Sequence, residues 1–180
     1  NYPVPQHICE YTHDLIQKNA LTFDKSENDH MVLTYHDSCN VARASRMGDT
    51  PGGQFTIPRD IIKATCNNFY DMPEHAIKEG TYCCGGGGGL LTDDLIELRV
   101  KGALPRMEAL KHVTENNGVT HMAAICAICK SQFSKVFPYY DFTMDQIVSV
   151  HQLVSNAIVL TQEDEGDSDD NKQSDDAEAA

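Results

Sequence analysis

The sequence has few basic residues and no long apolar run, and both deficits exclude classes of function. Its 180 residues contain 14 Lys and Arg against 27 Asp and Glu, so the formal net charge is −13. We expect no nucleic-acid partner, because a phosphate backbone must be met by a basic face. The longest apolar run, Met122–Cys129, has eight residues, whereas a membrane-spanning helix needs about 20. We therefore expect no direct insertion into a membrane.

The first residues also lack the features of a secretory signal. The chain opens with Asn-Tyr-Pro-Val-Pro-Gln, which has neither a basic start nor an apolar stretch, and it has no initiator Met. We therefore expect it to be the C-terminal part of a larger protein. Its length suits one domain with a real core.

The acidic excess is concentrated at the C-terminus. Residues 161–180 carry nine acids against one base, Lys172, and no apolar side chain larger than Ala. Such a segment cannot bury enough surface to offset the entropy of ordering, so we predict a disordered tail after a domain of residues 1–160. The tail is either a solvated segment or one that steers a basic partner.

Hydrophobic periodicity predicts an α/β domain. Predicted strands are residues 30–36, 68–72 and 120–125, and predicted helices begin at Pro58, at Thr92 and after a capping box of Thr143 and Gln146. The second helix is expected to bend or restart at residues 102–105, and the third to carry Ile147 on its apolar face. Alternating strands and helices indicate a layered βαβ-type domain with parallel strands.

The seven cysteines require an explanation of their own. They lie at positions 9, 39, 66, 83, 84, 126 and 129. An odd count, two close pairs and the lack of a secretory signal argue against a disulfide framework. Reduced thiols that serve as metal ligands fit better.

Five of these cysteines fall where predicted strands end. Cys39 follows the first strand, Cys83 and Cys84 follow the second, and Cys126 closes the third, with Cys129 just beyond it. The carboxyl ends of neighbouring parallel strands meet at one crevice, where open α/β sheets place their sites. We expect the five thiols to lie on loops at these strand ends and to converge.

Soft thiolates favour an iron–sulfur cluster or zinc over hard cations. Neighbouring side chains point apart, so the vicinal pair Cys83 and Cys84 suits a cluster with several irons better than a tetrahedral zinc site. Residues 85–89 are all glycine, and backbone N–H groups in such a loop can turn toward anionic sulfur. A phosphate-binding role is disfavoured, because neither Gly-Lys-Ser/Thr nor a Gly-x-Gly-x-x-Gly fingerprint is present.

The combined pattern of residues 35–39, 83–87 and 125–129 resembles the CCG domain of heterodisulfide-reductase-type iron–sulfur proteins, over roughly residues 5–160. The spacing is Cys39-x43-Cys-Cys-x41-Cys-x2-Cys, slightly longer than is typical of that family. The resemblance implies a noncubane [4Fe-4S] cluster held by Cys39, Cys83, Cys84, Cys126 and Cys129. It also implies that a preceding region carries cubane [4Fe-4S] clusters and a divergent first CCG half.

The same resemblance implies an oxidoreductase that acts on sulfur groups. In the family, the cluster is where a disulfide or trisulfide is split or formed. The substrate expected here is the C-terminal cysteine arm of a DsrC-like small carrier protein. Electrons are expected from a quinol-linked cytochrome b-type membrane subunit, which with other subunits would hold the protein on the cytoplasmic face of the cell membrane.

Three residues near the predicted ligands have open roles. His36 either hydrogen-bonds cluster sulfur or donates a proton to a leaving thiolate, as a catalytic residue, or it only caps the strand end. Arg43 and Lys130 either counter cluster charge and guide a peptide arm or are ordinary surface bases.

The remaining candidates have structural explanations. Cys66 is predicted to be a buried core thiol, Cys9 a free thiol without a role in a polar segment, and His151 a core histidine. Two alternatives to the catalytic hypothesis remain: a cluster that only relays electrons or serves another substrate, and a structural zinc module.

Overall fold

The computed structural model describes residues 5–89 and 91–160, and the predicted acidic tail lies outside them. Three parallel strands form one sheet in the order β1-β2-β3: β1 is Leu33–Tyr35, β2 is His121–Ala124 and β3 is Ile147–Ser149. The predicted α/β class with parallel strands is confirmed. No helix within the described residues is long and apolar enough to cross a bilayer.

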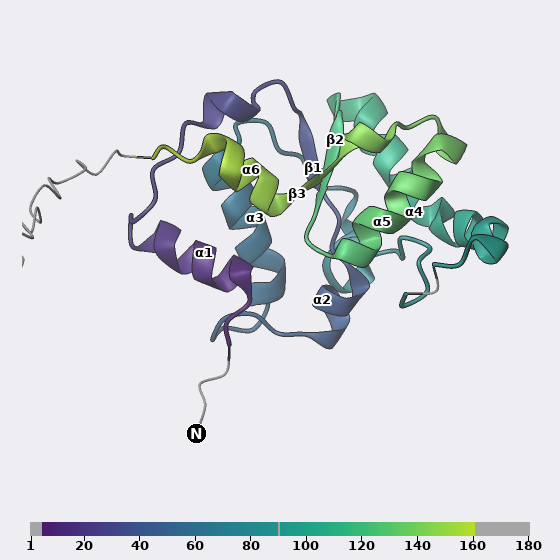
Figure 1. Ribbon diagram of the computed structural model, residues 1–180, viewed down its shortest axis with the longest axis horizontal. Helices are drawn as coiled ribbons and strands as arrows, with labels where there is room; N and C mark the ends of the chain where they lie inside the picture. The colour runs from purple at the N-terminus through teal and green to yellow at the C-terminus, as the bar shows by residue number, and fades with distance from the viewer. Residues whose placement is uncertain (1–4, 90, 161–180) are drawn as a thin grey trace, which may run out of the picture.

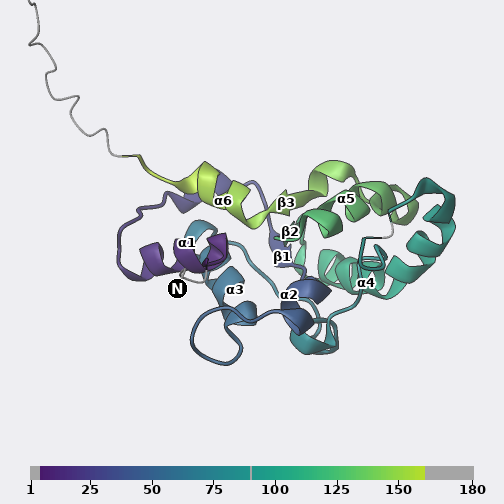
Figure 2. The ribbon, with the colours of Figure 1, turned by 60° about the horizontal axis from the view of Figure 1, so that its bottom comes forward.

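Helices cover both faces of this small sheet (Figure 1). On one side lie α1 (Ile8–Gln17), α3 (Gly53–Thr65) and α6 (Val150–Ala157); on the other lie α4 (Ile96–Asn117) and α5 (Ala127–Val136). The short α2 (Cys39–Ala44) lies beyond the end of β1, as Figure 2 also shows. Short 3₁₀ turns are η1 (Lys25–Asn28), η2 (Glu74–Ala76), η3 (Lys78–Gly80), η4 (Asp93–Leu95), η5 (Phe137–Tyr140) and η6 (Met144–Gln146).

Two hydrophobic cores result from the alternation of side chains along the strands. Leu33 and Tyr35 of β1 are buried in the core shared with α3 and α6. Met122 of β2 is buried in the other core, which α4 and α5 complete. His36 directly follows Tyr35 and contacts Phe133 of α5 edge-on, with the ring centroids 4.9 Å apart. The end of β1 therefore presents His36 to the α5 side.

The predicted strand at residues 68–72 is wrong. This segment makes a single parallel bridge, between Leu33 and Phe69, flanked by backbone hydrogen bonds from Leu33 N to Asn68 O (2.9 Å) and from Tyr70 N to Leu33 O (2.8 Å). Pro73 follows closely, and the chain continues in 3₁₀ turns. Proline cannot donate a ladder hydrogen bond, which limits pairing at this edge.

Two predicted helix limits are also corrected. The helix expected to begin at Pro58 begins at Gly53. The helix α4 continues through Pro105 without the predicted restart. In both cases the residues around the proline are buried, among them Phe55 in α3 and Met107 in α4. Tertiary packing outweighs the loss of one backbone donor.

The third correction concerns Ile147. The predicted capping box is present, and Thr143 N donates to Gln146 Oε1 (2.7 Å). It opens a 3₁₀ turn, and the chain then enters β3, in which Ile147 pairs with Met122. The helix begins only at Val150. Pairing with β2 gives these backbone groups their partners, which a sequence pattern of apolar residues does not show.

Candidate metal centre

Two of the predicted ligand positions begin helices at the carboxyl ends of neighbouring strands. Cys39 is the first residue of α2, just after β1, and Cys126 is the N-cap of α5, just after β2. The two strands stay paired up to this point, since His36 N donates to Ala123 O (2.9 Å). Cys129 lies in the first turn of α5 and is buried, whereas Cys39 and Cys126 are half-buried.

Cys83 and Cys84 reach the same region by a different route from that predicted. They follow the irregular segment after Pro73 and open the glycine loop, where Gly85 N donates to Cys83 Sγ (3.3 Å). Gly85 has φ +87°, and a Cβ there would lie 2.2 Å from the Arg99 carbonyl oxygen. Only glycine fits, because the loop is pressed against α4.

One group of donor atoms comes together in the interior. His36, Cys84 and Cys129 each offer one ligand atom, these atoms lie within 4.8 Å of one another, and all three residues are buried. Cys83 directly precedes Cys84 in the chain, and Cys84 in turn influences the pKa of Cys83. Among the described residues, Cys39 and Cys126 are not members of this tight group.

The vicinal thiols of Cys83 and Cys84 hold their protons when no metal is bound. Hydrogen bonding to Cys129, together with burial, raises the pKa of Cys84 to about 12. Hydrogen bonding to Cys84 and burial likewise raise the pKa of Cys83. A bound metal must therefore displace protons, so its affinity rises with pH. Buried sulfur donors with one imidazole fit a soft metal centre such as an iron–sulfur cluster.

His36 is fully buried, and neither ring nitrogen has a hydrogen-bond partner among the described residues. Burial and the nearby positive charge of Arg106 hold its pKa well below the ordinary value, so the imidazole is neutral. Buried polar atoms are normally paired. The orphaned nitrogens beside two thiols are a second indication that a polar or metallic group belongs here.

Asp37 connects two ligand-bearing segments, a role that the sequence analysis missed. Its carboxylate accepts a hydrogen bond from Lys78 N (2.9 Å), and its backbone carbonyl accepts one from Thr81 Oγ1 (2.7 Å). These bonds link the turn before Cys39 to the segment that leads to Cys83. The available signal was the position of Asp37, two residues before a predicted ligand.

Arg106 is a second residue that the sequence did not single out. It is fully buried, and its guanidinium donates to Ala76 O (2.7 Å) and Thr81 Oγ1 (2.6 Å). Burial lowers the pKa of Arg106 to about 10, while the charge of Asp37 acts in the opposite direction. Its two hydrogen bonds hold the segment that leads to Cys83. An arginine within the apolar face of α4 was the only sequence signal.

The two basic residues singled out near the predicted ligands, Arg43 and Lys130, differ in their contacts. Arg43 donates to the backbone carbonyls of Glu79 (2.9 Å) and Thr81, so it holds the segment before Cys83. Lys130 is half-buried on α5, one residue after Cys129.

Cys66 is buried in the core at 3% exposure, as predicted. Cys9 is also fully buried, so the expectation of a polar setting is wrong, and burial raises its pKa to about 12. It lies on the inner face of α1, a helix that was not predicted. His151 lies 3.2 Å from Thr12 Oγ1, in agreement with a satisfied core histidine.

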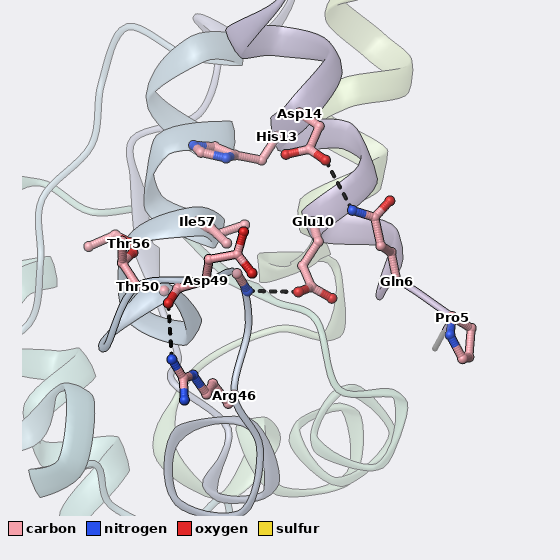
Figure 3. A pocket seen from close by; sticks show the side chains of 12 residues that line it. Pro5, Gln6, Glu10, His13, Asp14, Arg46, Asp49, Thr50, Thr56 and Ile57 are labelled. Carbon is pink, nitrogen blue, oxygen red and sulfur yellow. Dashed lines mark hydrogen bonds between the residues drawn. The ribbon is translucent and has the colours of Figure 1, made fainter. Parts of the chain in front are cut away.

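A separate cavity of about 520 Å³ lies between α1, α3 and the loop that joins α2 to α3 (Figure 3). None of the described residues that line it is a cysteine. Two of its polar side chains are already partnered: Glu10 accepts from Gly48 N (2.7 Å) and Gln6 donates to Asp14 (3.0 Å). Because this cavity has no thiol, the cluster of buried thiols is the better candidate for a metal centre.

The fold, the vicinal cysteines and the glycine loop together define a class of protein. The chain belongs to the CCG cysteine-rich domain family, which matches residues 33–134. This match covers all five predicted ligand cysteines.

Relatives of the chain are found among redox proteins. It is 43% identical over 155 residues to the "Hdr-like menaquinol oxidoreductase iron-sulfur subunit 2" of Archaeoglobus fulgidus, covering 86% of this chain and 26% of that protein. It is 34% identical over 105 residues to a subunit of the dihydromethanophenazine:CoB--CoM heterodisulfide reductase of Methanosarcina acetivorans, covering 54% and 23%.

A third relative is the "EtfAB:quinone oxidoreductase" of Syntrophomonas wolfei, 32% identical over 89 residues, covering 49% of this chain and 11% of that protein. The chain thus spans about a quarter of the length of the first two relatives and about a tenth of the third. No solved structure matches the chain.

Proposed function

We propose that this domain holds a noncubane [4Fe-4S] cluster, with the ligands Cys39, Cys83, Cys84, Cys126 and Cys129. The observation that carries the proposal is the meeting of buried Cys84 and Cys129 beside an unpaired His36. Membership of the cysteine-rich family and the iron–sulfur relatives support it. The half-buried Cys39 and Cys126 begin α2 and α5 at the same edge of the sheet, where they complete the ligand set.

We further propose that the chain is the C-terminal part of a DsrK-type subunit of the DsrMKJOP membrane complex. Residues 36–43 and 83–94 resemble that protein. Its function is then to exchange electrons between a quinone-linked complex and a disulfide or trisulfide on a DsrC-like carrier. The names of two relatives, a menaquinol oxidoreductase subunit and a heterodisulfide reductase subunit, agree with the two ends of this route.

When bound, such a cluster supplies single electrons and an iron that can accept substrate sulfur. The protein's own groups provide geometry and charge. Its thiols give up their protons to hold the group, and the glycine loop keeps side chains away from the approach. His36 is neutral, so it serves as a hydrogen-bond donor or ligand to sulfur or iron. Burial of His36, Cys84 and Cys129 excludes water from this side of the centre.

The partners follow from the same proposal. A cytochrome b-type membrane subunit and the other Dsr subunits deliver or accept electrons and hold the protein at the inner face of the cell membrane. Further cubane [4Fe-4S] clusters belong to the preceding part of the subunit. The greater length of the relatives supports this division.

The first test is the anaerobic content of iron, acid-labile sulfide and zinc per chain. About four irons with matching sulfide, the stoichiometry of a [4Fe-4S] site, are expected for this domain. One zinc without sulfide would overturn the proposal in favour of a structural zinc module.

An electron relay for another substrate is the second candidate, and the similarity to an EtfAB:quinone oxidoreductase favours it. An assay with a DsrC-like carrier separates the two. Cluster-dependent reduction or formation of the carrier's disulfide supports the first candidate. Cluster oxidation and reduction by quinone partners, without any change in the carrier, supports the relay.

A further inference from the structure

Gln132 lies on α5, one helical turn after Cys129, and its side chain is fully buried. Its Oε1 accepts two hydrogen bonds from Arg99, one from Nε (2.8 Å) and one from Nη2 (2.6 Å). A guanidinium has only donors, so the amide oxygen must face it. The orientation of the amide is therefore determined by chemistry, and its NH₂ group must point away from Arg99.

Arg99 is itself held in place. It is 3% exposed, and its Nη1 donates to the carbonyl oxygen of Thr92 (3.0 Å). Rotation of the Gln132 amide by a half-turn would place its NH₂ group against this cation and remove both hydrogen bonds. The Arg99 side chain thus fixes the orientation of the Gln132 amide.

The NH₂ group of Gln132 lies next to the glycine loop. A Cβ placed on Gly85 would lie 2.9 Å from Gln132 Nε2. Gly85 directly follows Cys84, and its own N–H donates to Cys83 Sγ. The amide nitrogen therefore lies beside the backbone of Gly85, the residue that follows the vicinal thiols.

This NH₂ group has no hydrogen-bond partner within the described part of the chain. An unpaired buried donor is destabilising, and buried amides are normally satisfied. No described protein atom accepts a hydrogen bond from it, whereas anionic sulfur of a metal centre would be an acceptor. The orphaned amide is thus explained by a group that the thiols hold.

We propose that Gln132 donates an amide N–H to anionic sulfur of the metal centre, and that Arg99 fixes the amide for this purpose. The inference rests on the proposed cluster and adds a residue that sets its reduction potential. Addition of one electron makes the sulfur more negative, so a fixed donor stabilises the reduced state more than the oxidised state. Gln132 therefore raises the potential.

The main test is Gln132→Met in the full subunit, which keeps the side-chain length and removes the donor. In an anaerobic redox titration followed by electron paramagnetic resonance, we expect the ratio of reduced to oxidised centre at a fixed potential to fall about tenfold, equal to 59 mV for one electron. Gln54→Met on α3 is the matched control, and it should titrate like the wild type. An unchanged ratio in Gln132→Met would overturn the inference.

Gln132→Met removes the acceptor of two of the Arg99 hydrogen bonds, so a second variant controls for misfolding. Gln132→Glu keeps an oxygen for Arg99 and has no amide nitrogen. In the wild type grown with ¹⁵N-labelled glutamine side chains, electron–nuclear double resonance should detect one ¹⁵N coupled to the centre, and Gln132→Glu should lose it. Absence of any coupling in the wild type would overturn the inference.

Metal analysis of the wild type keeps the two proposals apart. If the wild type contains iron and sulfide but shows no ¹⁵N coupling, only the role of Gln132 is refuted, and the cluster proposal stands. Zinc without sulfide refutes the cluster itself, and the donor role falls with it.

Discussion

The guanidinium of Arg59 holds both oxygens of the Asp37 carboxylate, with Nη1 2.8 Å from Oδ1 and Nη2 2.7 Å from Oδ2. The side chains are 7% and 1% exposed. Through its third nitrogen, Nε, the same arginine bonds Asp71 at 2.9 and 3.0 Å. This pair ties α3 to the turn before Cys39 and, through Asp37, to the segment before Cys83. The position of the proposed ligands thus depends on a buried ion pair that is not itself part of the proposed ligand set.

Asp37→Asn should be strongly destabilising. Removing the charge of Asp37 leaves the buried Arg59 paired only with the partly exposed Asp71, so the cost should approach the about 3–5 kcal/mol of a broken buried ion pair. Asp71→Asn is the control, because that partner of Arg59 is 33% exposed and the loss should stay near or below about 1 kcal/mol. Urea unfolding of the two variants measures the difference. Equal losses would show that Asp37 has no special role.

Gly85→Ala should disrupt the cysteine loop. The new Cβ would lie 2.2 Å from the Arg99 carbonyl oxygen at a residue with φ +87°, and strain plus overpacking should cost about 3 kcal/mol. Gly88 is the control: its φ is +74°, and a Cβ built there would have no described atom within 4 Å. Gly88→Ala should therefore cost only the backbone strain of about 1–2 kcal/mol. Thermal unfolding and iron content check both variants. A Gly88→Ala variant that is the less stable of the two would contradict the packing argument.

Cys83→Ala should abolish the native cluster signal, whereas Cys66→Ala should leave it. Cys83 opens the glycine loop beside Cys84, while Cys66 is a core thiol at the end of α3, 3% exposed, next to Thr65. Iron, sulfide and visible absorbance of the two variants, purified without oxygen, decide the matter. The reverse pattern would show that the ligand assignment is wrong.

Acidification should destabilise the domain partly through His151. Burial, followed by the charge of His7, lowers its pKa below the ordinary 6.5. The unfolded chain therefore binds the proton more readily than the folded protein, so stability is complete above pH 6.5 and falls as pH decreases through that value. His151→Gln should reduce the loss of stability between pH 7 and pH 5. Urea unfolding at these two pH values measures it, and an unchanged loss would argue against a depressed pKa.

Several elements were predictable because their signals are local. The strand ending at Tyr35 and the strand ending at Ala124 both follow from periodicity and turn chemistry. The capping box at Thr143 is equally local. It was placed correctly, yet the element after it was not, because strand β3 exists only through pairing with β2.

The argument that predicted one thiol site, that the cysteines follow parallel strands, holds for Cys39 and Cys126 but not for the vicinal pair. Cys39 and Cys126 follow real parallel strands. Cys83 and Cys84 follow no strand, and they are brought in by hydrogen bonds from Lys78 and Thr81 to Asp37. Side-chain contacts between distant segments have no sequence period, so no pattern could reveal them.

Composition and local pattern determined which chemistry is available: seven thiols, a glycine loop and an α/β alternation that sends loops to one edge of a sheet. The packing of distant segments determined which groups meet and in what state. Burial of His36 keeps it neutral, and Arg99 turns the amide of Gln132 toward the glycine loop. The residue types set the donors, whereas desolvation and hydrogen bonding across distant segments set their charge and direction.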